Sequence, residues 1–549
     1  MQWLFAALLA MCVTMLLIPP LVYWSGRLGV LDQPGGRKVH AQPIPRVGGM
    51  AMGAAMLLAL VVWGQQGVEL QAYLLATVVL LVFGIQDDRL TLSPGWKFAG
   101  QVLAALIVMY PGHVMVSSVR VVEPYDLPVW LSAPLTLCLI VGFTNAINLA
   151  DGLDGLAGGA ALMCLSGVLL LALSSDSTPV MLMCVVTMGA VLGFLRFNTH
   201  PARIFMGDAG SQLLGFSAAV FSLILTQDRT LPYSAALPLL LLGVPVIDTL
   251  TVMTERVLEG KSPFQADRTH VHHRLLALGF DHREAVTVIY GAQALLMTLA
   301  WTLRFASDLL ILGVFVGAAL TVVTVLRQAR LRQWRWRAEI PDPLVPAPHS
   351  WLSRQVSWLW QDERLNHWVG MTVGGAMVGY GLLVIANGLK APQDIRMLAL
   401  GLAVAVGISL LLRRTGEAAS WLERAVLYVS ALVAVSLDRP GELPDPVKFW
   451  LELAVFGTLG LALAIRLYLS ADRRFRMTPL DVLVLLVAVA LPNLPGSVLS
   501  TYAAGWLVGK VLLLLYGIEN LSLSSNVQRL IMTGSTLIFL AAVALSAGL

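Results

Sequence analysis

Long apolar runs recur through this 549-residue chain and restrict the folds that it can adopt. Runs of roughly 17 to 25 apolar residues are long enough to cross a ~30 Å hydrocarbon core as helices. Hydrophobic residues make up 57% of the chain and charged residues 12%, which is about half the charged fraction of an ordinary soluble domain. We therefore predict an all-α polytopic membrane protein, with about eleven transmembrane helices up to Val325 and about seven more after Trp368.

Basic residues are concentrated in alternate loops, which predicts the orientation of the chain. The intervening loops hold few of them; residues 112–128, for example, contain only Arg120. The positive-inside rule therefore places the N-terminus outside and the basic loops in the cytoplasm. These basic loops cover residues 27–46, 89–97, 196–203, 256–283 and 327–337.

Residues 327–366 interrupt the apolar pattern with arginine, tryptophan and proline. This composition is typical of a cytoplasmic linker with an interfacial helix that meets anionic lipid. The predicted organisation is a membrane module over 1–326, this basic linker over 327–366, and a C-terminal membrane module over 367–549 with no assigned role. The formal charge of +4 is not gathered into a dense basic patch, which argues against nucleic-acid binding.

The predicted cytoplasmic loops hold the strongly polar clusters of the first module. Asp87 and Asp88 are adjacent carboxylates, which repel one another unless a cation or a basic partner compensates them. They could organise Mg²⁺ or act as a general base with its electrostatic partner. The alternative is a solvated helix end in which the pair neighbours Arg89.

Four polar side chains recur every three residues at Asn145, Asn148, Asp151 and Asp154. A helical turn would place them along one stripe, and their oxygens suit Mg²⁺. A capped helix start is the alternative, but it accounts for one residue of the four. Asp208, set between glycines in a later loop, is a further metal-ligand candidate.

Two loops combine histidine with basic residues. Residues 267–274 include His270, His272, His273 and Arg274, which suit recognition of a polyanion better than zinc, because cysteine partners are missing. The first loop offers Arg37, Lys38 and His40 for a phosphate. Ordinary positive-inside charge is the alternative for both loops.

Asp248 lies within the ninth apolar segment, where a buried carboxylate is expensive. A functional role is therefore the first expectation for Asp248. Hydrogen bonds that pack helices together, through Thr249 or Thr251, are the alternative.

In this order the motifs resemble the polyprenyl-phosphate N-acetylhexosamine-1-phosphate transferases, over roughly residues 1–330. The forms Arg37-Lys38-Val-His40, Pro45-Arg46-Val-Gly-Gly and His270-Val-His272-His273 look like the WecA-like branch of that family. The resemblance implies transfer of a sugar-1-phosphate from a UDP-sugar to undecaprenyl phosphate. UDP-GlcNAc is the expected donor, and another UDP-N-acetylhexosamine is the alternative. The products would be undecaprenyl-pyrophosphate-sugar and UMP, at the cytoplasmic face of a bacterial inner membrane, as the first step of surface polysaccharide synthesis.

The resemblance also implies roles for individual residues. Asn148 and Asp208 would hold Mg²⁺ or Mn²⁺, Asp87 and Asp88 would lie beside the lipid phosphate, and Asp151 and Asp154 would order the nucleotide and metal site. The remaining candidates, expected to bind substrate, are Arg37, Lys38, His40, Asn145, His270, His272, His273 and Arg274. Membrane lipids, a second copy of the chain and a polysaccharide-assembly partner complete the partners to consider.

Two alternatives stay open. A direct in-line displacement is the preferred route, and a covalent phospho-aspartate route is the other. A transporter or flippase of polyprenyl-linked sugars is the rival function, but transporters place substrate near the bilayer midplane between structural repeats. Here the polar residues gather at one predicted surface, and we find no convincing internal repeat.

Overall fold

The computed structural model is mostly helical and divides into two compact units. The first unit is described up to residue 336 and the second from residue 363, and each is treated by itself. The described residues are 2–33, 43–64, 67–121, 123–228, 230–262, 270–336, 363–411, 417–438, 445–469, 510, 513, 514, 517, 518 and 526–546.

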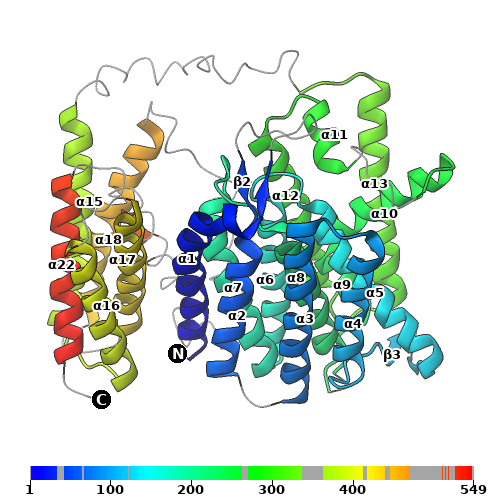
Figure 1. Ribbon diagram of the computed structural model, residues 1–549, viewed down its shortest axis with the longest axis horizontal. Coiled ribbons are helices and arrows are strands. Elements are labelled where there is room, and N and C mark those ends of the chain that lie inside the picture. The colour runs from blue at the N-terminus through cyan, green and yellow to red at the C-terminus, as the bar shows by residue number, and fades with distance from the viewer. Residues whose placement is uncertain are drawn as a thin grey trace. The chain divides into compact units, whose positions relative to one another are not determined.

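The first unit is a bundle of helices that run mainly along a common direction (Figure 1). Eight helices of this unit are long and apolar enough to cross a membrane, counted over the described residues. This supports a polytopic membrane protein, while the number of eleven spans remains a prediction. The helices are α1 (Gln2–Leu28), α2 (Gly48–Trp63), α3 (Val68–Leu90), α4 (Pro94–Met109), α5 (Val129–Ala150), α6 (Leu156–Ser174), α7 (Thr178–Asn198), α8 (Gly207–Thr226), α9 (Leu237–Leu241), α10 (Gly243–Leu258), α11 (Val271–Ala277), α12 (His282–Thr302) and α13 (Asp308–Leu331).

Helix α8 forms the centre of this unit. It packs against α2, α3, α5 and α6. Of its most apolar stretch of 18 residues, 94% is buried. By contrast, only 11% of the corresponding 18-residue stretch of α13 is buried. A helix that is apolar on all sides and lies at the edge of such a bundle suits contact with lipid. The polar residues at the start of α8 are therefore held by the best-packed helix of the unit.

Two short antiparallel hairpins lie at opposite ends of the bundle (Figure 1). Strands β1 (Leu31–Asp32) and β2 (Ile44–Pro45) pair at the end that also holds α11. Strands β3 (Ser118–Arg120) and β4 (Pro124–Asp126) pair at the other end. A parallel bridge between Arg46 and Phe205 joins the first hairpin to the loop that leads into α8.

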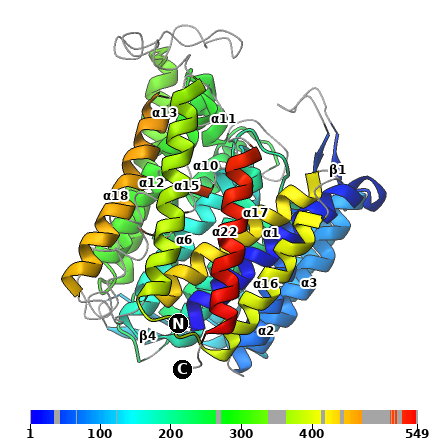
Figure 2. The same cartoon turned by 90° about the vertical axis from the view of Figure 1, so that its left-hand side faces the viewer.

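The second unit contains five long helices in its described part (Figure 2). Helix α15 packs on α18 and α22, while α16 packs on α17 and α22. Their bounds are α15 (Glu363–Ala386), α16 (Gln393–Leu411), α17 (Glu417–Leu437), α18 (Asp445–Leu469) and α22 (Asn526–Leu545).

A buried ionic network ties the helices of the second unit together. Asp438, which follows α17, pairs with Lys448 of α18 at 2.7 Å and also with Lys510. Lys510 reaches Glu452 at 2.8 Å, and the Tyr380 hydroxyl donates to Asp438 at 3.0 Å. Buried charges of opposite sign that compensate one another are tolerated in an apolar bundle.

Candidate active site

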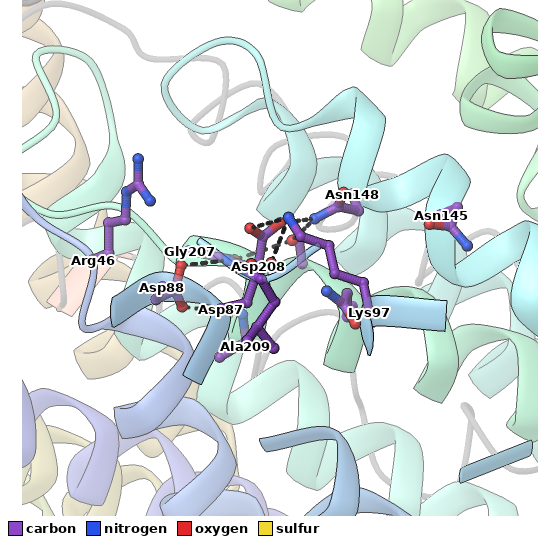
Figure 3. Close-up of polar contacts among 12 residues, drawn as sticks. Arg46, Asp87, Asp88, Lys97, Asn145, Asn148, Gly207, Asp208 and Ala209 are labelled. Carbon is purple, nitrogen blue, oxygen red and sulfur yellow. Dashed lines mark hydrogen bonds and ion pairs between the residues drawn. The ribbon is translucent and has the colours of Figure 1, made fainter. Parts of the chain in front are cut away.

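Two carboxylates from different helices converge on one ammonium group at the end of the first unit (Figure 3). Asp87 lies in the last turn of α3 and Asp208 in the first turn of α8. The Lys97 ammonium, from the first turn of α4, lies 2.5 Å from Asp87 Oδ2 and 3.4 Å from Asp208 Oδ2. Leu92 N donates to the other Asp87 oxygen at 2.8 Å. A cation therefore already lies where these two acids meet.

Asp88 faces different partners from its neighbour Asp87. Its oxygens accept the backbone N–H groups of Asp208 (2.9 Å) and Ala209 (3.2 Å). Helix α8 has no side-chain cap of its own, so Asp88 supplies that cap from α3. Gly207 makes this approach possible: its φ is +69°, and a Cβ there would lie 2.4 Å from Asp88 Oδ2.

Asn145 and Asn148 lie three residues apart on α5 but contact different groups. Asn148 Nδ2 donates to Asp208 Oδ1 at 2.6 Å and to Ser211 Oγ at 2.7 Å. Asn145 Nδ2 donates to Gln101 Oε1 at 2.7 Å, and the residue lies apart from the carboxylates (Figure 3). Asn148 thus orients Asp208, and Asn145 joins α5 to α4. We refer to Asp87, Asp88, Lys97, Asn148 and Asp208 as the carboxylate centre.

The predicted stripe of four polar residues on one helical turn is wrong. Helix α5 ends at Ala150, and Asp151 already leaves helical geometry, with φ −77° and ψ 58°. Gly155, at φ +80°, then redirects the chain into α6. Asp154 therefore points to other partners: its Oδ2 lies 2.7 Å from His200 Nδ1 and accepts Ala202 N at 3.0 Å.

Asp151 and Asp154 have opposite electrostatic surroundings. Burial, followed by the negative charges of Asp208 and Asp88, raises the pKa of Asp151 to about 7. Burial would also raise the pKa of Asp154, but the hydrogen bonds from His200 and Ala202 outweigh it and lower that pKa below its ordinary value. Asp151 therefore experiences the negative charge of the carboxylate centre. Asp154 instead forms a neighbouring cluster with His200 and His282.

That neighbouring cluster contains two histidines that the sequence did not single out. The rings of His200 and His282 stack at 4.1 Å between centroids with an interplanar angle of 24°. His282 Nε2 also lies 3.2 Å from the backbone carbonyl of Asp154. The three side chains are close enough to share a metal ion. However, face-to-face rings direct their nitrogens poorly at one point, so we interpret the cluster as a hydrogen-bonded support for the loop after α5.

The histidine loop, residues 270–274, lies against the loop that follows α5. His270 is buried and its Nδ1 lies 3.0 Å from Asp248 Oδ2. A Cβ on Gly152 would lie 2.1 Å from His272 Nε2, so the His272 ring packs directly on the loop after α5. Burial lowers the pKa of His272 to about 4, which keeps the ring neutral near pH 7.

His273 and Arg274 of the histidine loop are more accessible than His272. The ring of His273 contacts that of His272 at 4.3 Å and is only partly buried. Arg274 pairs with Glu255 of α10, with Nη1 3.1 Å from Oε1. Arg37, Lys38, His40 and Asp267 lie outside the described residues.

Lys97 is the main site residue that sequence reasoning missed. It is a single lysine at the start of an apolar helix, and no motif surrounds it. The available signal is electrostatic: it lies nine residues after Asp88, across a short turn, and two adjacent acids require a nearby cation.

The carboxylate centre can bind and orient a charged ligand. It combines hard oxygen donors with a cation that neutralises them, at the end of a tightly packed helix. Asp87 is almost fully buried, whereas Asp208 and Lys97 retain 26% and 31% side-chain exposure and can therefore meet a ligand. Hard oxygen donors of this kind suit Mg²⁺.

Comparison with known proteins places this arrangement in a family. The model of glycosyl transferase family 4 matches residues 70–226, a range that includes Asp87, Asn148 and Asp208. A probable undecaprenyl-phosphate N-acetylglucosaminyl 1-phosphate transferase of Bacillus subtilis is 38% identical over 289 residues, which cover 52% of this chain and 80% of that protein.

Two further relatives give the same result. A decaprenyl-phosphate N-acetylglucosaminephosphotransferase of Mycobacterium tuberculosis is 35% identical over 52% of this chain and 78% of its own length. An undecaprenyl-phosphate alpha-N-acetylglucosaminyl 1-phosphate transferase of Escherichia coli is 30% identical over 50% of this chain and 76% of its own length. The family resemblance inferred from the motifs is confirmed: the chain belongs to glycosyl transferase family 4.

Proposed function

We propose that this protein transfers a sugar-1-phosphate, GlcNAc-1-phosphate first among the candidates, from a UDP-sugar to undecaprenyl phosphate. The relatives described above carry names for this transfer to undecaprenyl or decaprenyl phosphate. The observation that carries the proposal is the convergence of Asp87 and Asp208 on the Lys97 ammonium. Both substrates are anions, so the reaction needs a site that can compensate negative charge.

A divalent cation fits this centre by the chemistry of its donors. Lys97 shows that a positive charge is accepted between the two acids. In the proposal Asp208 and Asn148 would hold Mg²⁺, with Asp87 beside them. When bound, Mg²⁺ would offset the charge of the diphosphate. Asn148 now directs its amide nitrogen at Asp208, so its other proposed contribution is to hold that carboxylate in place.

The residues of the chain would then divide the remaining work. An oxygen of the lipid phosphate attacks the β-phosphorus of the UDP-sugar. The bond from that phosphorus to the oxygen bridging the two phosphates breaks, and its electron pair leaves with UMP. Asp87, buried beside Lys97, would keep the acceptor phosphate deprotonated, and Lys97 would turn from the carboxylates toward phosphate oxygens. Asp88 would fix the start of α8 throughout.

The membrane orientation belongs to the same proposal. Basic loops on the side of the carboxylate centre favour a cytoplasmic active site and an N-terminus outside, in the bacterial inner membrane. A soluble UDP-sugar would then meet the lipid phosphate at the cytoplasmic surface. The role of the second unit stays outside this proposal.

The test incubates purified full-length protein with undecaprenyl phosphate, Mg²⁺ and a panel of UDP-sugars, and follows UMP release. Asp208→Ala and Asp87→Asn should abolish turnover while thermal unfolding in detergent remains cooperative. Asp176→Asn is the matched control, because Asp176 is exposed in the turn between α6 and α7 and its positive φ of +53° suits asparagine. UMP release that persists in Asp208→Ala would refute the metal role of Asp208. Sugar-lipid translocation without UMP release would support the transporter instead.

A further inference from the structure

Asp248, a buried carboxylate outside the carboxylate centre, contacts the histidine loop at two points. Asp248 belongs to α10 and is 5% exposed. Its Oδ1 accepts the backbone N–H of Val271 at 2.8 Å, and its Oδ2 lies 3.0 Å from His270 Nδ1. Burying a carboxylate is costly unless hydrogen bonds satisfy it, and here both oxygens are satisfied by a single segment of chain.

The first consequence concerns the His270 ring. Because a carboxylate only accepts, the proton must lie on His270 Nδ1, and Nε2 is the nitrogen without a proton. A carboxylate that orients a histidine through its second nitrogen is a common way to fix the tautomer and direction of a functional imidazole.

The second consequence concerns the position of α11. His270 precedes this helix and provides no side-chain cap, so Asp248 takes up the first N–H of the helix instead. The same turn carries His272, whose ring packs on Gly152. Asp248 therefore fixes, through one backbone and one side-chain contact, how the histidine loop lies against the loop after α5.

Helix packing alone does not account for Asp248. Thr249 could have offered a polar contact between helices, but its Oγ1 is buried without a hydrogen-bond partner in the described part of the chain. Both oxygens of Asp248 are instead directed to residues 270 and 271.

We propose that Asp248 is a positioning residue, which touches no substrate and holds His270 and the start of α11 in the arrangement that turnover requires. This inference rests on the proposed transferase function for its kinetic effect. The placement of the loop by Asp248 is a separate claim, and a measurement without substrate can test it.

The substrate-free measurement uses diethyl pyrocarbonate, which modifies accessible histidine nitrogens, with mass spectrometry of each histidine. His270 should react slowly in wild type and at least several-fold faster in Asp248→Ala. The exposed His113 is the internal standard and should react equally in both proteins. Equal labelling of His270 in wild type and Asp248→Ala would overturn the proposal, even if no UDP-sugar were turned over.

The kinetic measurement uses UMP release by Asp248→Ala, Asp248→Asn, His270→Gln and the Asp248→Asn/His270→Gln double variant. The two Asp248 variants should lose roughly 10- to 100-fold in kcat, with a smaller change in KM. In Asp248→Asn, the new amide would offer an N–H to Nδ1 of His270 and so impose the opposite tautomer. The double variant should be no slower than His270→Gln alone, because the asparagine oxygen can still accept the N–H of Val271 and only the contact to His270 changes. Losses that multiply, or wild-type turnover in Asp248→Ala, would overturn the proposal.

Asp308→Asn is the matched structural control. Asp308 is also buried, at 9% exposure, and accepts hydrogen bonds from Arg120 N and Ala236 N near the β3–β4 hairpin. This variant should lower the thermal midpoint but leave kcat of the folded protein within about threefold of wild type. An equal kcat loss in Asp308→Asn and Asp248→Asn would mean that destabilisation, and not positioning, explains the effect. If wild type releases no UMP, the transferase proposal fails and labelling alone decides the role of Asp248.

Discussion

Gly84 allows α3 and α8 to approach closely, one turn before the adjacent aspartates. A Cβ at this position would lie 2.4 Å from Ala209 Cα and 2.9 Å from Ala209 N. Ordinary van der Waals contact begins near 3.4 Å. Replacing Gly84 by alanine must therefore separate the two backbones by about 1 Å, because the obstructing atoms belong to the main chain and cannot rotate away.

The effect on stability should be small because two terms oppose each other. Overpacking of this kind costs about 1–3 kcal/mol. Alanine is more favourable than glycine inside a helix by about 1 kcal/mol, which offsets part of that cost. The net cost of about 0–2 kcal/mol should lower the thermal midpoint by a few degrees at most for a unit of this size.

The effect on turnover should be much larger. The same 1 Å shift moves Asp208, which follows Gly207 at the start of α8, relative to Asp87 on α3. A misplacement of about 1 Å can cost about 100-fold in rate. We expect Gly84→Ala to lose roughly 100-fold in kcat while it remains folded.

The assay pairs UMP release per folded protein with thermal unfolding in detergent. Gly142→Ala in α5 is the control, because a Cβ there meets nothing within 4 Å and should leave both quantities near wild type. The reasoning is refuted if Gly84→Ala keeps its turnover within about threefold of wild type. It is also refuted if Gly142→Ala loses as much.

Two further predictions concern the charges of the site. Lys97→Met leaves Asp87 and Asp208 facing each other without their cation. The free energy of unfolding without Mg²⁺ should therefore fall by about 1 kcal/mol and be regained when Mg²⁺ is added. Thermal unfolding with and without Mg²⁺ checks this, and an unchanged response to Mg²⁺ would contradict it. For Asp151, burial raises the folded-state pKa from 3.8 to about 7, so the folded protein holds a proton that the unfolded chain releases. Between these two values stability must fall as pH rises, so the thermal midpoint of wild type should drop relative to that of Asp151→Asn from about pH 4 to about pH 7 and level off above that. Parallel curves for the two proteins would argue against a raised pKa.

The grouping of the main acids was predictable, because topology decides it. Asp87, Asn148 and Asp208 each lie where an apolar segment meets a loop on the same predicted side, and the structure brings them together. The His272 ring likewise reaches the loop after α5. Charge patterning and segment length were sufficient for these contacts, since both are properties of the local sequence.

The division of labour within each motif was not predictable from spacing. Asp154 pairs with His200, 46 residues away, because α5 ends at Ala150 and the glycines that follow turn the chain. Periodicity alone treated Asp154 as a continuation of the helix. Lys97 was missed for a related reason: its role depends on the three-dimensional approach of α4 to α3 and α8, and a single lysine leaves no pattern.

Asp87 and Asp88 are neighbours at the end of α3 but contact different groups. Asp88 accepts two backbone N–H groups at the start of α8, so a substitution at Asp88 should loosen the packing of α8 on α3. Asp87 instead faces the Lys97 ammonium. Variants made to change the proposed substrate preference should therefore keep both Asp88 and Gly207, because the two residues together hold the start of α8.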